Sequence, residues 1–329
     1  MATFSVLKMH FTSPIHIGQG VTESYGRSGR ILHSDSISGA LAATFSSLYP
    51  DEDVKQFMES FQLSSAFPFS GEKLFFPKPM IKLLVSSENE SLVSTKKLKK
   101  LEYFDQSSFE NILQGNELNV STPEQLAGEG HFFLTKPERT FQSPYSSTVV
   151  QRVAVPRGDG GDASPFYFER LTFEKNCGFW CFFKVAEDYR NRFLKCLIHL
   201  GENGIGTDRT VGNGQFNVEI DSLDLALPES NGNNLSLSLF WPAETEINGL
   251  ELDKSAYLLK NRGGFIAGSS NEQFRHLRRK SVYMFVEGSV FAGKIEGKID
   301  NLRPDWNDSK LHPVWRDGRV FSLPIIVNS

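Results

Sequence analysis

The histidines of the sequence do not form a pattern that is typical of a metal centre. The 329-residue chain contains seven, and none belongs to a His-Glu-x-x-His motif or to another metal pair at helical spacing. We therefore expect no metal site, and we expect no cofactor. His16 and His33 lie near Ser34 and Asp35, where a general base could act. Such groups more often cap a helix or bond the backbone, and both interpretations stay open.

A glycine-rich loop at residues 201–214 is the strongest local feature. It fits neither common nucleotide signature, because Arg209 occupies the third glycine position of G-x-G-x-x-G and no Gly-Lys-Ser/Thr triplet occurs. Glycines allow main-chain N–H groups to approach phosphates closely, and an arginine adds a charge-assisted contact. We predict a phosphate cradle, with a flexible turn as the alternative. Its glycines are Gly201, Gly204, Gly206, Gly212 and Gly214.

A second candidate is the basic segment 257–284, which holds six Lys or Arg residues and one acid, Glu272. Glycines and aromatic residues are interleaved with the basic ones. This mixture suits single-stranded nucleic acid, since cations follow the phosphate backbone while rings stack on bases. A solvated charged face is the alternative. The residues concerned are Lys260, Arg262, Gly263, Gly264, Phe265, Arg275, Arg278, Arg279, Lys280, Tyr283 and Phe285.

Three further arginines, Arg139, Arg152 and Arg157, lie in a polar segment at about 86–163. The segment is too long for a plain loop and poor in apolar periodicity, so we predict a projecting insertion with some hairpin and helical content. Arginines on such an arm could reach a ligand that the body of the protein holds. Scattered surface arginines are an equally good interpretation of the sequence.

The composition restricts the class of protein. There are 35 Lys and Arg against 39 Asp and Glu, a formal net charge of −4, which excludes a generally cationic nucleic-acid-coating protein. Three cysteines without paired zinc spacing argue against a disulfide framework. No stretch reaches the roughly 18 apolar residues of a membrane span, and no signal peptide is evident. We expect a cytoplasmic protein without a membrane segment.

The order of the predicted elements indicates an α+β fold. A polar linker at Pro228–Asn234 divides the chain into residues 1–227 and a smaller β-rich part, residues 228–329. The first part reads βαββαβ, a ferredoxin-like unit with a long insertion before its third strand. Its elements are a strand at 2–12, a helix at 36–49, a strand at 74–85, dense apolar strands at 166–185, a helix at 188–200 and a strand from Gln215.

Several motifs, in order along the chain, resemble the RAMP superfamily of CRISPR-associated proteins, and most closely its subunits that cap the 5′ end of crRNA in type III-A effector complexes. The second half carries the motifs most specific to these subunits, whereas the glycine loop is general to the superfamily. The matching stretches are Pro14–Gly18, Leu32–Ser36, Phe75–Pro79, Pro165–Arg170, Gly204–Phe216, Lys260–Phe265, Arg279–Ser289 and His312–Gly318.

The resemblance implies two ferredoxin-like (RRM-like) units, the first with a thumb-like insertion. It implies a non-catalytic RNA-binding subunit that grips the repeat-derived 5′ tag of crRNA, with the thumb approaching the target RNA near the tag. The partners would be the large polymerase/cyclase subunit and the backbone RAMP subunit of the complex. The implied RNA-binding residues are His16, Arg27, Arg30, Ser34, Arg152, Arg157, Gly204, Gly206, Arg209, Gly212, Gly214, Arg262, Gly263, Gly264, Phe265, Arg278, Arg279 and Lys280.

Two alternatives remain. Some relatives in the superfamily are metal-independent endoribonucleases that process precursor crRNA, and His16 or His33 would then be the acid or base. A scaffold that binds only protein is the other, and it would retain no RNA on purification.

Overall fold

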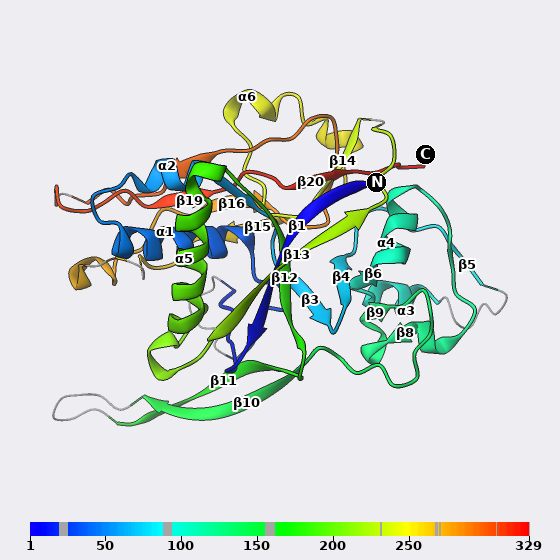
Figure 1. The fold of residues 1–329 in the computed structure, drawn as a ribbon, viewed down its shortest axis with the longest axis horizontal. Coiled ribbons are helices and arrows are strands. Elements are labelled where there is room, and N and C mark those ends of the chain that lie inside the picture. Colours follow the sequence, from blue (N-terminus) through cyan, green and yellow to red (C-terminus); the bar gives the residue numbers. More distant parts are fainter. Residues whose placement is uncertain are drawn as a thin grey trace.

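A computed structural model describes residues 1–19, 26–87, 94–154, 162–230, 232–266, 269, 271–306 and 308–328. The fold is mixed α+β, with one large sheet, several two- or three-stranded sheets and few helices (Figure 1). No helix in the described ranges has the length and apolar character needed to cross a membrane.

Four antiparallel strands form the centre of the large sheet, in the order β13–β1–β12–β3. The side chains of β1 alternate between two cores, as a strand requires: Leu7 and Met9 face one, and Val6 faces the other. The strands are β1 (Ala2–Phe11), β3 (Phe67–Ser70), β12 (Cys177–Val185) and β13 (Phe216–Leu225), and the short β2 (Phe61–Leu63) also pairs with β12.

Three helices pack against the Leu7 face of this sheet. Helix α1 (Ser34–Leu48) ends just before Pro50, and α2 (Val54–Glu59) begins where the Asp53 carboxylate accepts hydrogen bonds from the backbone. Helix α5 (Glu187–Asn203) follows β12 directly. Apolar residues at helical spacing, such as Leu41 and Phe45 of α1, complete this core.

The predicted projecting insertion is largely part of the body. Phe104, Phe109 and Phe133 are fully buried, and the strands here extend the large sheet through β4, β6, β9 and β8. The apolar residues come in short clusters between polar runs, so no periodicity shows in the sequence. The elements are β4 (Lys73–Pro77), β5 (Val85–Ser86), α3 (Thr95–Lys100), β6 (Tyr103–Asp105), α4 (Gln106–Leu113), β7 (Leu118–Asn119), β8 (Leu126–Ala127) and β9 (Phe132–Phe133).

A two-stranded ribbon of described residues projects from the body (Figure 1). It consists of β10 (Tyr145–Ala154) and β11 (Ser164–Phe173), which pair antiparallel along their whole length. Only the end of segment 86–163, in β10, takes part in this hairpin, and β11 lies beyond the segment. The expectation that the whole of 86–163 projects is wrong, because β6, β8 and β9 extend the large sheet.

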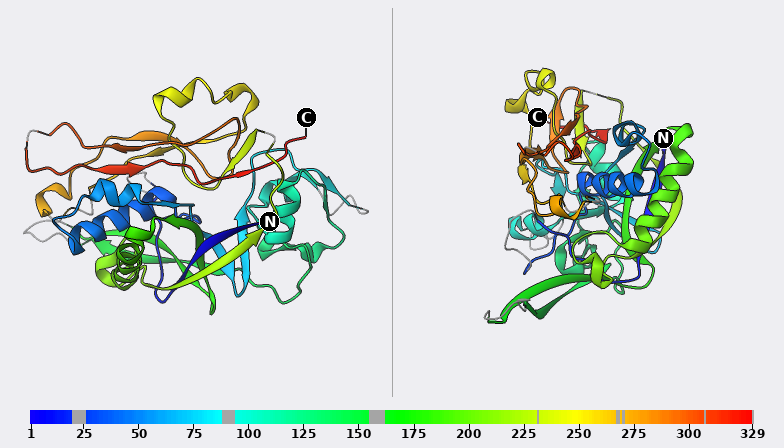
Figure 2. Two further views of the ribbon diagram at one scale, coloured as in Figure 1. Left: turned by 45° about the horizontal axis from the view of Figure 1, so that its top comes forward. Right: turned by 90° about the vertical axis from the view of Figure 1, so that its left-hand side faces the viewer.

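The second half forms a layer over α1 and α2 (Figure 2). Its described residues form small antiparallel sheets and one helix of four residues, which differs from the single sheet with two helices of an RRM-like unit. The elements are β14 (Asn233–Ser236), α6 (Glu244–Ile247), β15 (Leu259–Arg262), β16 (Val282–Phe285), β17 (Val290–Ala292), β18 (Ile299–Asn301), β19 (Trp315–Asp317) and β20 (Ser322–Pro324).

A buried cluster of charged residues connects this layer to the start of α1. Asp35 accepts two hydrogen bonds from Arg262, at 2.9 Å from Nε and 2.8 Å from Nη2, and a further bond from Arg316. Beside it, His33 Nδ1 lies 2.8 Å from Glu287 Oε1, and Lys260 Nζ lies 3.0 Å from His33 Nε2. Burial alone would raise the pKa of Asp35, but the two guanidinium charges hold that pKa well below its usual range.

We predict that Asp35→Asn destabilises the protein by about 3–5 kcal/mol, because it leaves two buried arginines without a counter-charge. Chemical denaturation at pH 7 measures this difference. Asp305→Asn is the matched control: its carboxylate bonds Lys280 at 2.8 Å, but its side chain is 93% exposed. An exposed pair contributes about 0–1 kcal/mol, so this variant should stay close to the wild type.

The pH dependence gives an independent check on Asp35. A carboxylate with a depressed native pKa stabilises the fold fully above its unfolded pKa, about 3.9, and loses that contribution as the pH falls toward the native pKa. The stability difference between wild type and Asp35→Asn should therefore be constant near neutral pH and shrink below about pH 4. A difference that does not depend on pH would contradict the assignment.

Candidate nucleic-acid interface

The glycine loop lies between α5 and β13 and folds against the segment that follows β1. The Gly214 amide donates to Pro14 O at 2.8 Å, and the Thr207 amide donates to His16 O at 3.0 Å. Gly206 and Gly214 have φ values of +96° and +75°, and a Cβ at Gly214 would stand 1.9 Å from Ile205 O. The glycines thus allow the loop to pack tightly on backbone, which a flexible turn would not require.

The tip of the loop is open to solvent. Arg209 begins a short 3-10 turn, Arg209–Val211, and both Arg209 and Gly212 are exposed. Within the described part of the chain, the Arg209 side chain has no hydrogen bond or ion pair. A rigid loop therefore presents one guanidinium group that is available to a ligand.

Arg152 on β10 joins the ribbon to the glycine loop. Its guanidinium forms an ion pair with Asp208 and lies 4.4 Å from the centre of the Phe168 ring. Asp208, the neighbour of Arg209 in the sequence, therefore pairs with the ribbon and not with Arg209. His16 stacks on the same Phe168 ring, with centroids 4.6 Å apart, and its Nδ1 lies 2.6 Å from Glu169 O.

Arg30 adjoins this group through Glu169. Arg30 Nη2 bonds Glu169 Oε1 at 2.8 Å, and the Ser28 amide donates to Glu169 Oε2 at 2.6 Å. Burial would raise the pKa of Glu169, yet the bonds from Arg30 and Ser28 lower it overall. Arg27 is exposed. The structure thus brings His16, Arg30, Arg152 and the glycine loop together, although His16 is buried and can act only by positioning others.

The predicted residues of the second half divide into buried and exposed ones. Arg262 is only 5% exposed, and Ser34 is buried with its Oγ accepting from the Leu239 amide, so neither side chain is presented to RNA as predicted. Arg279 donates to Gly263 O from both Nε and Nη2, and burial lowers its pKa to about 9. The sequence pattern counted these charges correctly but could not show which of them face the interior.

Exposed groups remain at the end of the β15–β16 ribbon. Phe265 is 47% exposed, Arg278 lies over its ring and Lys280 is exposed beside Asp305. Gly263 and Gly264 form the backbone between these groups and β15. Arg157 lies outside the described residues. Tyr283, which is 65% exposed, was noted among the aromatic residues of the segment but was not selected as a binding residue.

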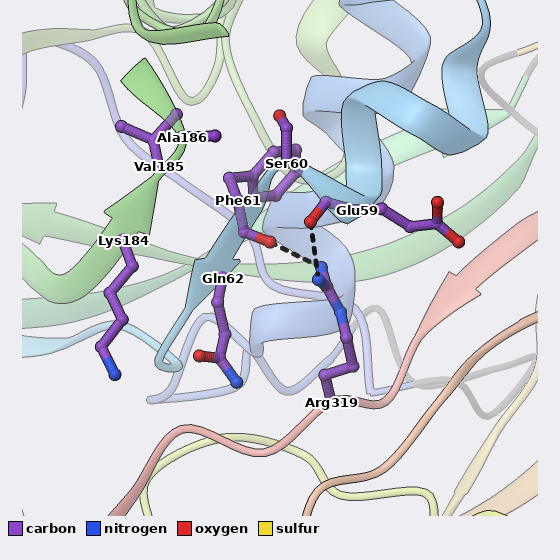
Figure 3. Close-up of a pocket in the computed structure, with 8 residues that line it drawn as sticks. All are labelled: Glu59, Ser60, Phe61, Gln62, Lys184, Val185, Ala186 and Arg319. Atoms are coloured by element: carbon purple, nitrogen blue, oxygen red, sulfur yellow. Dashed lines mark hydrogen bonds between the residues drawn. The ribbon is translucent and has the colours of Figure 1, made fainter. Parts of the chain in front are cut away.

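A shallow pocket lies elsewhere, between β2, β12 and Arg319 (Figure 3). The Arg319 guanidinium is directed at backbone carbonyls, with Nη2 2.6 Å from Phe61 O and Nη1 3.3 Å from Glu59 O, and it also bonds Asp317. Gln62 Nε2 donates to Val320 O at 2.8 Å. These groups serve the packing of the second half, so the pocket is not a candidate site. Nowhere in the described ranges do three His, Cys, Asp or Glu residues form a metal-binding group.

We predict that Gly214→Ala destabilises the protein more than Gly212→Ala. Both residues have positive φ, but a Cβ at Gly212 meets no atom within 4 Å. Gly212→Ala should cost only the left-handed backbone penalty of about 1–2 kcal/mol, while Gly214→Ala adds about 1–3 kcal/mol of overpacking. Urea denaturation of the two variants measures the difference. Equal stabilities would show that the loop does not hold this close backbone contact.

Comparison with known proteins shows which proteins the chain resembles. Residues 229–325 match the family model of the CRISPR Csm4 C-terminal domain. The CRISPR system Cms protein Csm4 of Thermococcus onnurineus is 25% identical over 308 residues, covering 90% of this chain and 92% of that protein. The protein of the same name from Mycobacterium tuberculosis is 25% identical over 266 residues, covering 80% of this chain and 79% of its own length.

The fold is also found in solved structures. One is a Csm1–Csm4 cassette in complex with cA4, with a TM-score of 0.62, 18% identity and complete coverage of both chains. Another is a Csm3–Csm4 subcomplex of the type III-A CRISPR-Cas interference complex, with a TM-score of 0.63, 17% identity and coverage of 99% of this chain and 100% of that one. The C-terminal domain match, the relatives that span most of the chain and the shared fold agree: over most of its length the chain is similar to the CRISPR-associated protein Csm4.

Proposed function

We propose that the protein is a non-catalytic RNA-binding subunit of a type III-A CRISPR effector complex, in which it caps the 5′ tag of crRNA. Its partners are the large polymerase/cyclase subunit and the backbone RAMP subunit, in line with the relatives crystallised with Csm1 and with Csm3. It acts in the cytoplasm, without a cofactor. The observation that carries the proposal is the rigid glycine loop that presents the exposed Arg209.

The RNA phosphates lie along the glycine loop in this proposal. Arg209 contacts a phosphate directly, and Gly204, Gly206, Gly212 and Gly214 set the path of the main chain. Arg27, Arg30 and Arg152 line the adjoining surface, where Asp208 and Glu169 hold two of the guanidinium groups in place. Ion-paired arginines on this surface still offer donors that do not face their carboxylates, because a guanidinium has five. Arg157 is assigned to the same surface from the sequence alone.

The first half is proposed to be a ferredoxin-like unit, and residues 1–227 and 228–329 to be the two domains. The strand order β13–β1–β12–β3, with α1 and α5 on one face, supports the first assignment. The β10–β11 ribbon is then the thumb, and it approaches the duplex between guide and target RNA near the tag. Its length and its projecting position support this role (Figure 1).

The alternative function, a metal-independent endoribonuclease, is not favoured by the surroundings of His33. Both of its ring nitrogens are engaged, by Glu287 and by Lys260, and the residue is buried. A general base must reach the proton that it removes, and this imidazole is closed off from a phosphodiester. His16 is likewise buried.

We predict that Arg209→Ala weakens binding of a single-stranded RNA with the repeat-derived 5′ tag. Because one phosphate contact is lost, the slope of log K against log salt concentration should become less steep by about 0.7. Fluorescence anisotropy at several salt concentrations measures both quantities. Arg192→Ala is the matched control, since Arg192 is a half-exposed arginine of α5 whose Nε bonds Glu52 Oε1 at 3.0 Å. It should leave the slope unchanged.

An unchanged slope in Arg209→Ala would remove the phosphate contact from the proposal. Incubation of the purified protein with repeat RNA in EDTA tests the catalytic alternative. Site-specific cleavage that disappears in His33→Ala would replace the proposed function with the nuclease. If the wild type retained no RNA when purified from cells that express crRNA, the protein would be a scaffold that binds only protein.

A further inference from the structure

The β15–β16 ribbon has two faces of opposite character. In its register Lys260 pairs with Met284 and Arg262 with Val282, while Asn261 pairs with Tyr283. Directly paired residues lie on the same face of an antiparallel ribbon, so the two cations share one face, and Asn261 and Tyr283 share the other. The sequence alternates strictly here, and the charged face is the inner one.

The inner face is fixed by the buried charge cluster. Arg262 is bound to Asp35, and Lys260 lies on His33, both at the start of α1. A one-residue slip of β15 would turn Arg262 outward and leave the Asp35 carboxylate without one of its partners. The ribbon is therefore held in one register, and its outer face is presented in one fixed orientation.

The outer face presents aromatic rings to solvent. Tyr283 is 65% exposed, Asn261 beside it is exposed, and Phe265 farther along is 47% exposed. The Arg278 guanidinium lies 5.1 Å from the centre of the Phe265 ring. Between the two ring positions the ribbon is narrow, because a Cβ at Gly263 would stand 3.2 Å from Ser281 Cβ. The two residues between the ring positions, Gly263 and Ser281, thus carry no large side chain.

We propose that this outer face binds an unpaired nucleobase of the RNA by stacking on Tyr283, with the Asn261 amide at the edge of the base and the Arg278–Phe265 pair receiving a second base or phosphate. The proposal rests on the proposed function, and it adds a base-binding site to the phosphate-binding loop. Tyrosine and phenylalanine rings and a guanidinium plane are the surfaces on which single-stranded RNA stacks.

The charge of the surroundings favours RNA over a protein ligand. Arg278 and Lys280 are exposed at the end of the outer face, where a backbone phosphate would lie. A stacked base contributes contact without charge, so a site of this kind does not need cations on its face. Leu258 and Leu259 are also exposed nearby, and they supply a control for protein docking.

Tyr283→Ala in the full-length chain tests the site with the tagged single-stranded RNA used for Arg209. Loss of one stacked base should weaken binding about tenfold, and Tyr283→Phe should retain the wild-type affinity because the ring is kept. The salt dependence should not change in either variant, since no charge is removed. This separates the site from the Arg209 contact, whose loss changes the slope. The exposed position of Tyr283 means that the interior is not disturbed.

Abasic substitutions along the RNA then identify the base. One abasic position should weaken wild-type binding and have no further effect on Tyr283→Ala, because both changes remove the same contact. Leu258→Ala and Leu259→Ala should leave RNA binding unchanged. The inference is overturned if Tyr283→Ala binds RNA like the wild type. It is also overturned if Tyr283→Phe binds RNA as weakly as Tyr283→Ala does.

The result also separates this site from the proposed function. Loss of affinity in Tyr283→Ala with an unchanged slope in Arg209→Ala would keep the base-binding face and reject the glycine-loop contact. The opposite result would reject the face alone. If Tyr283→Ala and the leucine variants bind RNA normally but release a protein subunit of the complex, the face is a protein-docking surface and the inference is wrong. A wild-type chain that binds no RNA would reject both.

Discussion

The Asp35 carboxylate is the group on which the arrangement of the two halves depends. It is fully enclosed at the first turn of α1, and its arginine partners lie 227 and 281 residues later in the chain. A buried carboxylate without counter-charges is strongly unfavourable, so the second half can settle on α1 only where both arginines reach it. A buried ion pair need not add stability over apolar packing, but it allows few alternative positions.

Burying the same charge cluster also costs free energy. Nε and Nη2 of Arg316 are buried and have no hydrogen-bond partner among the described residues, and the first effect of burial is to lower the pKa of this arginine. One carboxylate thus compensates two guanidinium groups incompletely. The neighbouring contacts of His33 with Glu287, and of Ser34 with the Leu239 amide, bind the same end of α1 to the same layer. Polar contacts therefore set the register between the halves at this end of α1, in addition to the apolar core to which Phe182 and Phe321 both belong.

The sequence predicted the elements whose residues follow a short period, and it missed what depends on distant pairing. The strand at β1, the helices α1 and α5 and the glycine loop were all visible, because apolar spacing and glycine content are local properties. The core contribution of Phe104 and Phe133 was not visible, since their clusters are too short to show a period. Arg262 was identified as an RNA-binding residue because nothing near it in the sequence shows that Asp35 is its partner.

The burial of basic side chains changes which parts of the chain can supply positive charge to RNA. Residues 257–284 have a net charge of +5, whereas the whole chain has −4, so the rest of the chain sums to −9. This distribution favoured a basic RNA-binding segment in the second half. Three of its basic side chains instead contact groups of the protein: Lys260 lies on His33, Arg262 binds Asp35, and Arg279 donates to the Gly263 carbonyl. Few cations of that segment therefore face solvent, while the ring of Tyr283 does. Phosphate contacts in the proposed interface must come mainly from the first half, through Arg209 and its neighbours, and the second half is left to interact with RNA mainly through the faces of its bases.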